Sequence, residues 1–298
     1  MVAPERRSGV ILLDKPTGLT SNAALQQVRR MFDRIKAGHT GTLDPLASGL
    51  LPICLGEATK FSQPLLESSK TYQASLRLGW RSSTGDAEGE LCSGASPDFD
   101  DARLLSAVAS LTGEIEQIPP MHSAIKVKGQ ALYKLARKGI SVERSSRRVD
   151  ILEFEATRLS GDSMEIRVRC SKGTYIRTLA EDLGDRLGCG AYLTALRRVA
   201  IGPIDIADAV SLDALERMPA AQRAMQLRPI DLLLGEMPEV RLNMADSKRL
   251  GHGMRVDGLG GALPGQVRVY SEAGDFLGLG DLGDDGSLKP KRLVSSAL

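Results

Sequence analysis

The chain has 298 residues, of which 42% are hydrophobic and 26% charged, and its formal net charge is +2. This is the composition of a soluble globular protein with one large domain, or with a large domain and a small one. The densest hydrophobic run, GLLPICLG, is interrupted by a proline, and the N-terminus has no long apolar segment. We therefore expect neither a membrane span nor a secretory signal, and we expect a cytoplasmic protein.

Cysteine and histidine are sparse and scattered. The four cysteines form no C-x-x-C pair, and there are only three histidines. We therefore predict no metal site, and in a reducing compartment we expect all four cysteines to be buried thiols.

In the first third of the chain, hydrophobic patterning predicts three regular elements. Residues 9–16 are typical of a short buried strand, and residues 21–33 of a helix with Ser21 as its N-cap. Residues 37–60 contain too much glycine and proline for a regular element. Residues 69–80 alternate strictly between apolar and polar, which predicts a strand with one buried face.

The middle of the chain alternates between helices and strands. We expect helices over residues 100–113, 173–188 and 211–218, and an antiparallel hairpin formed by residues 149–159 and 163–170. These patterns predict a mixed body of helices and strands.

The composition changes near residue 219, where a connector begins. The last 60 or so residues are rich in glycine and contain short strand-like runs. That pattern is typical of a small β-rich barrel appended to a larger body.

The near-zero net charge hides a polarised distribution. Residues 121–148 contain eight Lys or Arg and a single acid, Glu143, whereas residues 86–101 contain six acids. Such a basic block indicates either a docking surface for a polyanion or an exposed, solvated helix, and the charge pattern alone does not separate these interpretations.

Asp44 is the first candidate for chemistry. Asp followed by Pro is common in turns, so the simpler interpretation is that Asp44 only closes a turn. However, polar and glycine residues surround it in AGHTGTLDPLASG, and the apolar run that follows would supply a pocket floor. A carboxylate at the edge of an apolar pocket is costly unless it is paired or used.

Two further candidates have simple structural interpretations when each is considered alone. Tyr72 begins the inward row of its predicted strand and could be ordinary core. Arg177 falls at a strand-to-helix junction behind Gly173, where an arginine is usually a surface residue. If Arg177 faces Asp44, however, it would orient that carboxylate and keep it ionised.

Five segments in order resemble the motifs of the TruB family of bacterial tRNA pseudouridine-55 synthases. They are LLDKPTGLTSN, GHTGTLDPLASGLLPICLGEATK, KTYQASLRLG, PPMHSAIKVKGQALYKLARKG and CSKGTYIRTLAEDLG. The match runs from about residue 8 to about residue 205, and the tail resembles a PUA-type RNA-binding domain. The resemblance implies an α+β pseudouridine synthase fold over residues 1–230, with a basic insertion at 121–148, and a PUA-like domain over residues 238–298.

The resemblance also implies roles for individual residues. Asp44 matches the catalytic nucleophile, Tyr72 the aromatic residue that packs on the target base, and Arg177 the partner of the nucleophile. Other matches concern substrate binding: Leu196 would contact the uracil and His39 the RNA loop, and Lys15 is a further substrate-binding candidate. In the insertion the candidates are Lys126, Lys128, Lys134, Arg137 and Lys138, and in the tail Lys289, Lys291 and Arg292.

The implied reaction is the isomerisation of uridine 55 in the T loop of tRNA to pseudouridine. It needs no redox cofactor, energy source or metal, and it requires the target base to flip out of its stack into a closed pocket. We expect Tyr72, Leu196 and the LLPICL run to line that pocket. The expected partner is the T arm of tRNA, and the expected state is a monomer.

Two other classes of function remain open. One is a tRNA-binding or tRNA-folding protein that acts without catalysis, against which the intact Asp44, Tyr72 and Arg177 argue. The other is a metal-assisted phosphate hydrolase using Asp44 and His39, which would need a second carboxylate cluster nearby.

Overall fold

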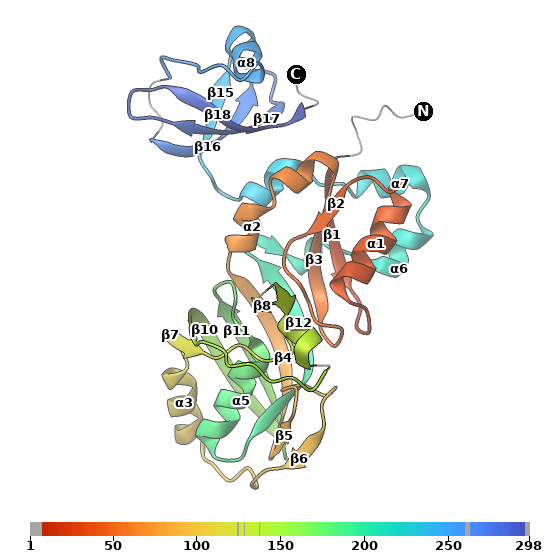
Figure 1. The fold of residues 1–298 in the computed structure, drawn as a ribbon, viewed down its shortest axis with the longest axis vertical. Helices are drawn as coiled ribbons and strands as arrows, with labels where there is room; N and C mark the ends of the chain where they lie inside the picture. Colours follow the sequence, from red (N-terminus) through yellow and green to blue (C-terminus); the bar gives the residue numbers. More distant parts are fainter. Residues whose placement is uncertain (1–7, 124, 128, 137, 260–262, 296–298) are drawn as a thin grey trace.

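The structure is a computed structural model that describes residues 8–123, 125–127, 129–136, 138–259 and 263–295 (Figure 1). A ten-stranded mixed sheet forms the body, and eight of its strands follow the order β14-β1-β3-β12-β4-β11-β10-β7, while β2 pairs with β3 and β13 with β12. These strands are β1 (Gly9–Lys15), β2 (Ala37–His39), β3 (Ser48–Leu55), β4 (Lys70–Leu78), β7 (Gly113–Gln117), β10 (Arg147–Ser160), β11 (Ser163–Cys170), β12 (Ala191–Ile201), β13 (Ile204–Asp205) and β14 (Val210–Ser211). The α+β class expected for the body is confirmed.

Helices and short hairpins complete the body. The α-helices are α1 (Ser21–Met31), α2 (Gln63–Glu67), α3 (Asp101–Ser110), α4 (Leu132–Ala136), α5 (Ile176–Leu187), α6 (Leu212–Arg217) and α7 (Ala220–Met225). The two-stranded pairs are β5 (Trp80–Ser82) with β6 (Leu91–Ser93), and β8 (Lys126–Val127) with β9 (Gln130–Ala131). The strands and helices predicted from hydrophobic patterning are confirmed, with shifts of a few residues at their ends.

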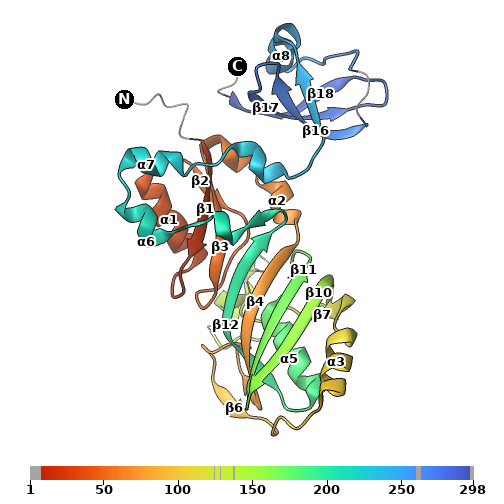
Figure 2. The ribbon, with the colours of Figure 1, turned by 180° about the vertical axis from the view of Figure 1, so that it is seen from behind.

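One half of the sheet packs against α5 and α3. The alternation in β4 directs Leu76 and Leu78 into a core that also receives Leu179 and Leu183 from α5 and Met164 from β11. The opposite face of β4, β11 and β10 is polar, and Figure 2 shows no helix over it.

The other half of the sheet packs against α1 and α6. Its core includes Leu13 from β1, Leu51 and Ile53 from β3, Val28 from α1 and Leu215 from α6. The prediction that residues 37–60 contain no regular element was wrong, because β3 is an almost completely buried strand. Its proline does not interrupt it, since burial of this apolar run stabilises the extended conformation.

The N-cap prediction for α1 was also wrong. Thr20 caps the helix by accepting a hydrogen bond from the Ala23 amide, whereas Ser21 lies in the first turn and is buried. A threonine followed by a serine offers two capping hydroxyls, and a sequence alone does not say which one caps. The displaced Ser21 makes a long-range contact near Asp44, described below.

Residues 239–293 contain a second, four-stranded sheet with the order β15-β16-β17-β18. Its elements are β15 (Glu239–Leu242), α8 (Met244–Gly251), β16 (Gly265–Ser271), β17 (Phe276–Leu282) and β18 (Leu288–Leu293). Phe276 contacts Phe61 of the body edge to face, with 5.3 Å between ring centroids, and Tyr270 donates to Asp231 at 2.7 Å. The two sheets therefore share an apolar and hydrogen-bonded junction (Figure 1).

Two further expectations can be compared with the structure. No helix in the described part of the chain combines the length and apolar character needed to cross a bilayer. Cys54, Cys170 and Cys189 are buried as expected, but Cys92 is exposed on the short strand β6, so the expectation of four buried thiols was wrong.

Candidate active site

Asp44 lies in the loop between β2 and β3, where its backbone closes a turn and its side chain pairs with Arg177. Its carbonyl accepts from the Ala47 amide at 3.1 Å, so its backbone does close a turn around Pro45. The preceding residue, Leu43, is fixed by Ser21, whose hydroxyl donates to the Leu43 carbonyl at 2.9 Å and accepts from the Leu43 amide at 2.7 Å. These contacts fix the backbone beside Asp44, and the Asp44 side chain points toward Arg177.

Arg177 occupies the first turn of α5, where Gln117 fixes the chain. The Gln117 side chain, at the end of β7, donates to the Tyr175 carbonyl at 3.1 Å and accepts from the Tyr175 amide at 3.0 Å. Gln117 is only 2% exposed, so this amide pair lies in a dry environment where such bonds hold their geometry well. Ser21 and Gln117 were not identified from the sequence, because neither contact is local.

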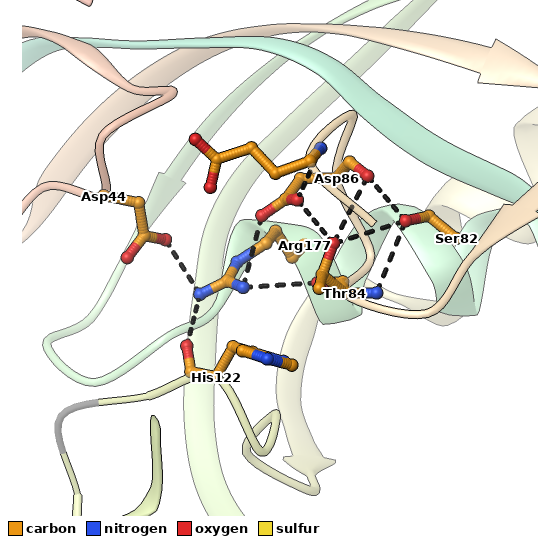
Figure 3. Close-up of polar contacts among 7 residues, drawn as sticks. Asp44, Ser82, Thr84, Asp86, His122 and Arg177 are labelled. Carbon is orange, nitrogen blue, oxygen red and sulfur yellow. Dashed lines mark hydrogen bonds and ion pairs between the residues drawn. The ribbon is translucent and has the colours of Figure 1, made fainter. Parts of the chain in front are cut away.

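The Arg177 guanidinium lies between two carboxylates. Nη2 is 2.8 Å from Oδ2 of Asp44, and Nη1 is 3.3 Å from Oδ2 of Asp86 on the opposite side (Figure 3). Nη2 also donates to the carbonyl of His122 at 2.7 Å, and Nη1 to that of Thr84 at 3.2 Å. The Asp44–Arg177 pairing predicted as one alternative is therefore present, and a second acid shares the cation.

Asp86 is buried, with only 4% of its side chain exposed, and a tight turn holds it. Its Oδ1 accepts from the Thr84 hydroxyl at 2.6 Å and from the Glu88 amide at 3.1 Å, while Ser82 donates to its carbonyl (Figure 3). It belongs to the acidic stretch 86–101, but sequence analysis did not single it out. A signal was present in the turn-forming TGD, although nothing in it indicated a partner about 90 residues away.

Asp44 is the more exposed of the two acids, with 41% of its side chain accessible. Burial raises the pKa of Asp44 above its ordinary value, and the neighbouring Asp86 charge raises it further, while Arg177 and Lys15 lower it. Arg177 therefore limits the rise in the pKa of Asp44 that burial would otherwise cause.

A cavity of about 290 Å³ opens beside this ion pair. Asp44, Arg177, Tyr72 and Leu196 all line it, so four of the predicted residues, from four separate segments, meet here. Tyr72 and Leu196 pack against the cores of both halves of the sheet, which places the cavity at the junction of the two halves. The LLPICL run was expected to line the pocket as well, but it forms β3 in the core, and the apolar lining comes instead from Leu43, Leu66, Ile176 and Leu196.

Arg198 also lines the cavity and was missed from the sequence. It is 1% exposed, and it donates from Nε to the Leu50 carbonyl at 2.8 Å and from Nη2 to the Gly41 carbonyl at 3.1 Å. Burial raises the pKa of the Tyr72 phenol, while the charge of Arg198 and a hydrogen bond with it lower that pKa. Two adjacent arginines in a strand were the available signal, since they must point to opposite faces.

Gly38, Gly41 and Gly49 lie around Asp44 in the sequence, and two of them approach Arg198 closely. A Cβ at Gly49, whose φ is +105°, would lie 2.3 Å from the Arg198 carbonyl oxygen, and one at Gly41 would lie 3.2 Å from its Nη1. Nothing lies within 4 Å of such an atom at Gly38. Two of the three glycines thus allow close packing of the Asp44 loop and β3 against β12.

Lys15 and His39 lie near the site but face inward. Lys15 is fully buried, its ammonium donates to the carbonyls of Pro16 and Leu19, and burial lowers its pKa to about 8. It shapes the turn after β1, and its contact with a substrate stays a prediction. Burial also lowers the pKa of His39, whose Nδ1 finds no hydrogen-bond partner among the described residues.

The insertion reaches the site through the His122 carbonyl. Beyond it lie the hairpin β8–β9 and helix α4, with Lys134 and Lys138 exposed. Lys128 and Arg137 lie outside the described residues, and for Lys126 only the backbone is described.

In the C-terminal sheet, two of the three basic residues expected to contact RNA are engaged within the protein. Lys291 pairs with Asp281 at 3.1 Å, and Arg292 donates to the Lys60 carbonyl at 2.8 Å. Lys289 is exposed.

A larger groove, of about 770 Å³, lies along the polar side of the sheet and is lined by Gln73, Glu165 and Arg167 among others, but Asp44 is not in its lining. The described residues contain no group of three or more His, Cys, Asp or Glu side chains placed to hold a metal ion. The chemistry-bearing groups therefore meet in the smaller cavity.

Comparison with known sequences assigns most of the chain, from residue 29 to residue 294, to one family. The family described as "TruB family pseudouridylate synthase (N terminal domain)" matches residues 29–176, and two TruB C-terminal families match residues 177–234 and 238–294. A protein named tRNA pseudouridine synthase B from Aromatoleum aromaticum is 54% identical over 97% of this chain and 93% of its own length. One of the same name from Dechloromonas aromatica is 51% identical over 97% and 96%.

Solved structures share the fold. A crystal structure of a Cbf5–Nop10–Gar1 complex includes a chain that is 25% identical and superposes with a TM-score of 0.73 over 97% of this chain and 85% of that one. The family models and the two relatives define the class of this protein as a pseudouridine-forming isomerase. The chain belongs to the TruB family of pseudouridylate synthases, and it is an enzyme.

Proposed function

We propose that this enzyme converts uridine 55 in the T loop of tRNA to pseudouridine, with Asp44 as the nucleophile. The relatives named above are tRNA pseudouridine synthases, which supports tRNA as the substrate. The single observation that carries the mechanism is the carboxylate of Asp44, held by Arg177 at 2.8 Å on the wall of a cavity that Tyr72 and Leu196 also line.

The reaction moves the ribose C1′ bond from N1 to C5 of the same uracil and releases the C5 proton. The target base must leave its stack, because a stacked uracil would not reach a cavity beside Asp44. Tyr72 and Leu196 offer apolar surfaces on which the ring can pack and turn. Exclusion of water protects the intermediate with the detached base from hydrolysis.

Asp44 needs no separate base to activate it, since the nucleophile is already the ionised form. Its carboxylate attacks either the ribose C1′ or the C6 of uracil, and both routes place the same groups around the ring. Arg177 restrains the attacking oxygen and limits the rise of its pKa.

The charge distribution supports different roles in RNA binding for residues 121–148 and residues 238–298. Residues 121–148 carry a charge of +7, from eight basic residues and Glu143, whereas residues 238–298 carry eight basic and eight acidic residues. We assign the first segment, as an insertion in a catalytic domain of residues 1–230, to the phosphates of the T arm. Residues 238–298 form a small RNA-binding domain that relies less on charge.

Incubation with an unmodified tRNA transcript, followed by mapping of the altered nucleotide, tests the proposal. We expect stoichiometric pseudouridine at position 55 and none in a transcript whose T loop is scrambled. Modification at another position, or none, would refute the assignment.

The charge assignment has its own matched test. In the double variant Lys134→Gln/Lys138→Gln, the plot of log affinity against log salt should become less steep, with the magnitude of its negative slope reduced by roughly 1.5 to 2. Each lost phosphate contact removes nearly one released counterion. A control with the same charge change, Lys248→Gln/Lys289→Gln in the C-terminal domain, should lower it by less than half as much. Equal slopes of log affinity against log salt for the two variants would contradict the assignment of the insertion to the phosphates of the T arm.

A further inference from the structure

Two buried arginines line the cavity, and they differ in their counter-ions. Arg177 contacts two carboxylates, Asp44 and Asp86. Arg198 makes no ion pair with any residue that the structure describes, although it is 99% buried, and the hydrogen bonds described for its side chain go to two carbonyl groups. A buried cation without an anion costs several kcal/mol relative to water, so its retention needs a reason.

Arg197 and Arg198 are neighbours in β12 and therefore point to opposite faces of the sheet, and of the two only Arg197 has an acidic partner among the described residues. Arg197 points to the opposite face, where it forms a two-pronged ion pair with Asp14 at 2.7 and 3.1 Å. Arg198 points to the same side as Leu196, two residues earlier, and lies beside Tyr72 in the register between β12 and β4. The cation without an acidic partner is therefore the one on the base-binding side.

The proposed reaction brings an anion to that side. If the Asp44 carboxylate attacks C1′, the electron pair of the C1′–N1 bond stays on N1 and the uracil leaves as an anion. If the carboxylate adds to C6 instead, the electron pair of the C5–C6 double bond moves toward O4 and forms an enolate. In both routes the carboxylate becomes a neutral ester and the ring gains one negative charge.

We infer that Arg198 is a catalytic residue that stabilises this negative charge on the uracil ring. This inference rests on the proposed function. The negative charge begins on Asp44, beside Arg177, and moves across the cavity to the ring, beside Arg198. In the C6 route the C1′–N1 bond then breaks, and its electron pair stays on N1. In both routes C5 next bonds to C1′ and the carboxylate is released, while the C5 hydrogen leaves as a proton and N1 takes up a proton, which restores the starting charges.

The placement meets the requirement for electrostatic catalysis. The guanidinium is fixed before the substrate arrives by its bonds to the Leu50 and Gly41 carbonyls, so it does not reorganise during the reaction. Because no described carboxylate neutralises the guanidinium, its positive charge is fully available to stabilise the negative charge of the transition state. An arginine already paired with an acid would stabilise the ring much less.

The test compares two T-arm RNAs, one with uridine and one with 5-fluorouridine at the target position. Fluorine at C5 withdraws electrons, so the ring carries negative charge more easily and depends less on a nearby cation. Single-turnover consumption of the target nucleoside is measured after digestion of the RNA. We expect Arg198→Gln to slow the uridine reaction about 100-fold, as for loss of one preorganised charge-stabilising donor, and the 5-fluorouridine reaction less than about tenfold.

Three further measurements separate a charge effect from a structural one. Arg198→Lys keeps the charge and should be faster than Arg198→Gln on uridine, whereas a role only in holding the two carbonyls predicts no such advantage. Arg197→Gln, the matched change on the opposite face, should leave both rates within about twofold. If Arg198→Gln does not fold by circular dichroism, Arg198→Met supplies the neutral variant.

An equal loss on both RNAs would overturn the inference, because it would mean that Arg198 only positions the Asp44 loop. That result is distinct from failure of the proposed function, in which the wild-type enzyme would consume neither RNA.

Discussion

The two walls of the cavity hold buried arginines in opposite electrostatic states. At the Arg177 wall, one cation serves two carboxylates, Asp44 and Asp86. At the Arg198 wall, the cation contacts carbonyl oxygens and a phenol, with no acid among the described residues. Before reaction, negative charge is therefore concentrated at the first wall and is lacking at the second.

The energetic cost of a buried cation therefore has to be assessed together with the charges that appear during the proposed reaction. In the proposed reaction, the Arg177 wall is arranged for the ground state, in which the negative charge is on Asp44. The Arg198 wall is arranged for a state in which the charge has moved to the substrate. Substitutions at Arg177, Asp86 and Ser21 test this contrast between the two walls.

Arg177→Met removes the cation from the acidic wall. Asp86, with 4% of its side chain exposed, is left without its ion pair, which should lower the free energy of unfolding by about 3–5 kcal/mol. Activity should fall at least about 100-fold. Because Arg177 lowers the pKa of Asp44, its loss raises that pKa, and the acidic limb of the single-turnover pH profile should move to higher pH. A limb that stays in place would contradict the pairing.

Asp86→Asn removes negative charge from the same wall and retains an acceptor for Arg177. The Asp86 charge raises the pKa of Asp44, so its removal should lower that pKa and move the acidic limb to lower pH. We expect a loss of about tenfold at neutral pH, since the guanidinium is held less firmly. The diagnostic result is that the acidic limbs of the Arg177→Met and Asp86→Asn pH profiles move in opposite directions. Shifts in the same direction would show that Asp86 does not act through Asp44.

Ser21→Ala tests the backbone that carries Asp44. It removes both hydrogen bonds to Leu43 and should lower the free energy of unfolding by about 1–3 kcal/mol in chemical denaturation. The turnover number should fall more than the affinity for tRNA, because the loop beside the nucleophile loosens while the insertion is unchanged. Ser62→Ala, whose hydroxyl makes only a 3.5 Å contact with the Thr59 carbonyl, is the control and should change neither quantity.

The sequence predicted the order and type of most elements, because amphipathic periods and turn residues act locally. It also predicted that Asp44, Tyr72, Arg177 and Leu196 belong to the site, and the structure brings these four to one cavity. Their roles in the reaction stay predictions. The motifs that carry these residues are contiguous, which is why they could be recognised.

The residues that sequence analysis missed act over long distances or depend on burial. Gln117 fixes a residue 58 positions away, and Ser21 one that is 22 positions away. Asp86 looked like one of several surface acids, and only its burial against Arg177 distinguishes it. β3 was missed because glycine and proline suggested a loop, while the burial that makes it a strand depends on β1 and β12 beside it.

The measurement that tests the central claim most directly is the release of tritium from C5 of uridine 55 in a single turnover. Formation of the carbon–carbon glycosidic bond must expel that hydrogen, so its release reports the chemical step itself. Wild-type enzyme should release the tritium completely. Asp44→Asn, which keeps the shape of the side chain but not its charge, should bind the tRNA within a few-fold of wild type and release none above background. Release by Asp44→Asn at a rate within about tenfold of wild type would contradict the assignment of Asp44 as the nucleophile.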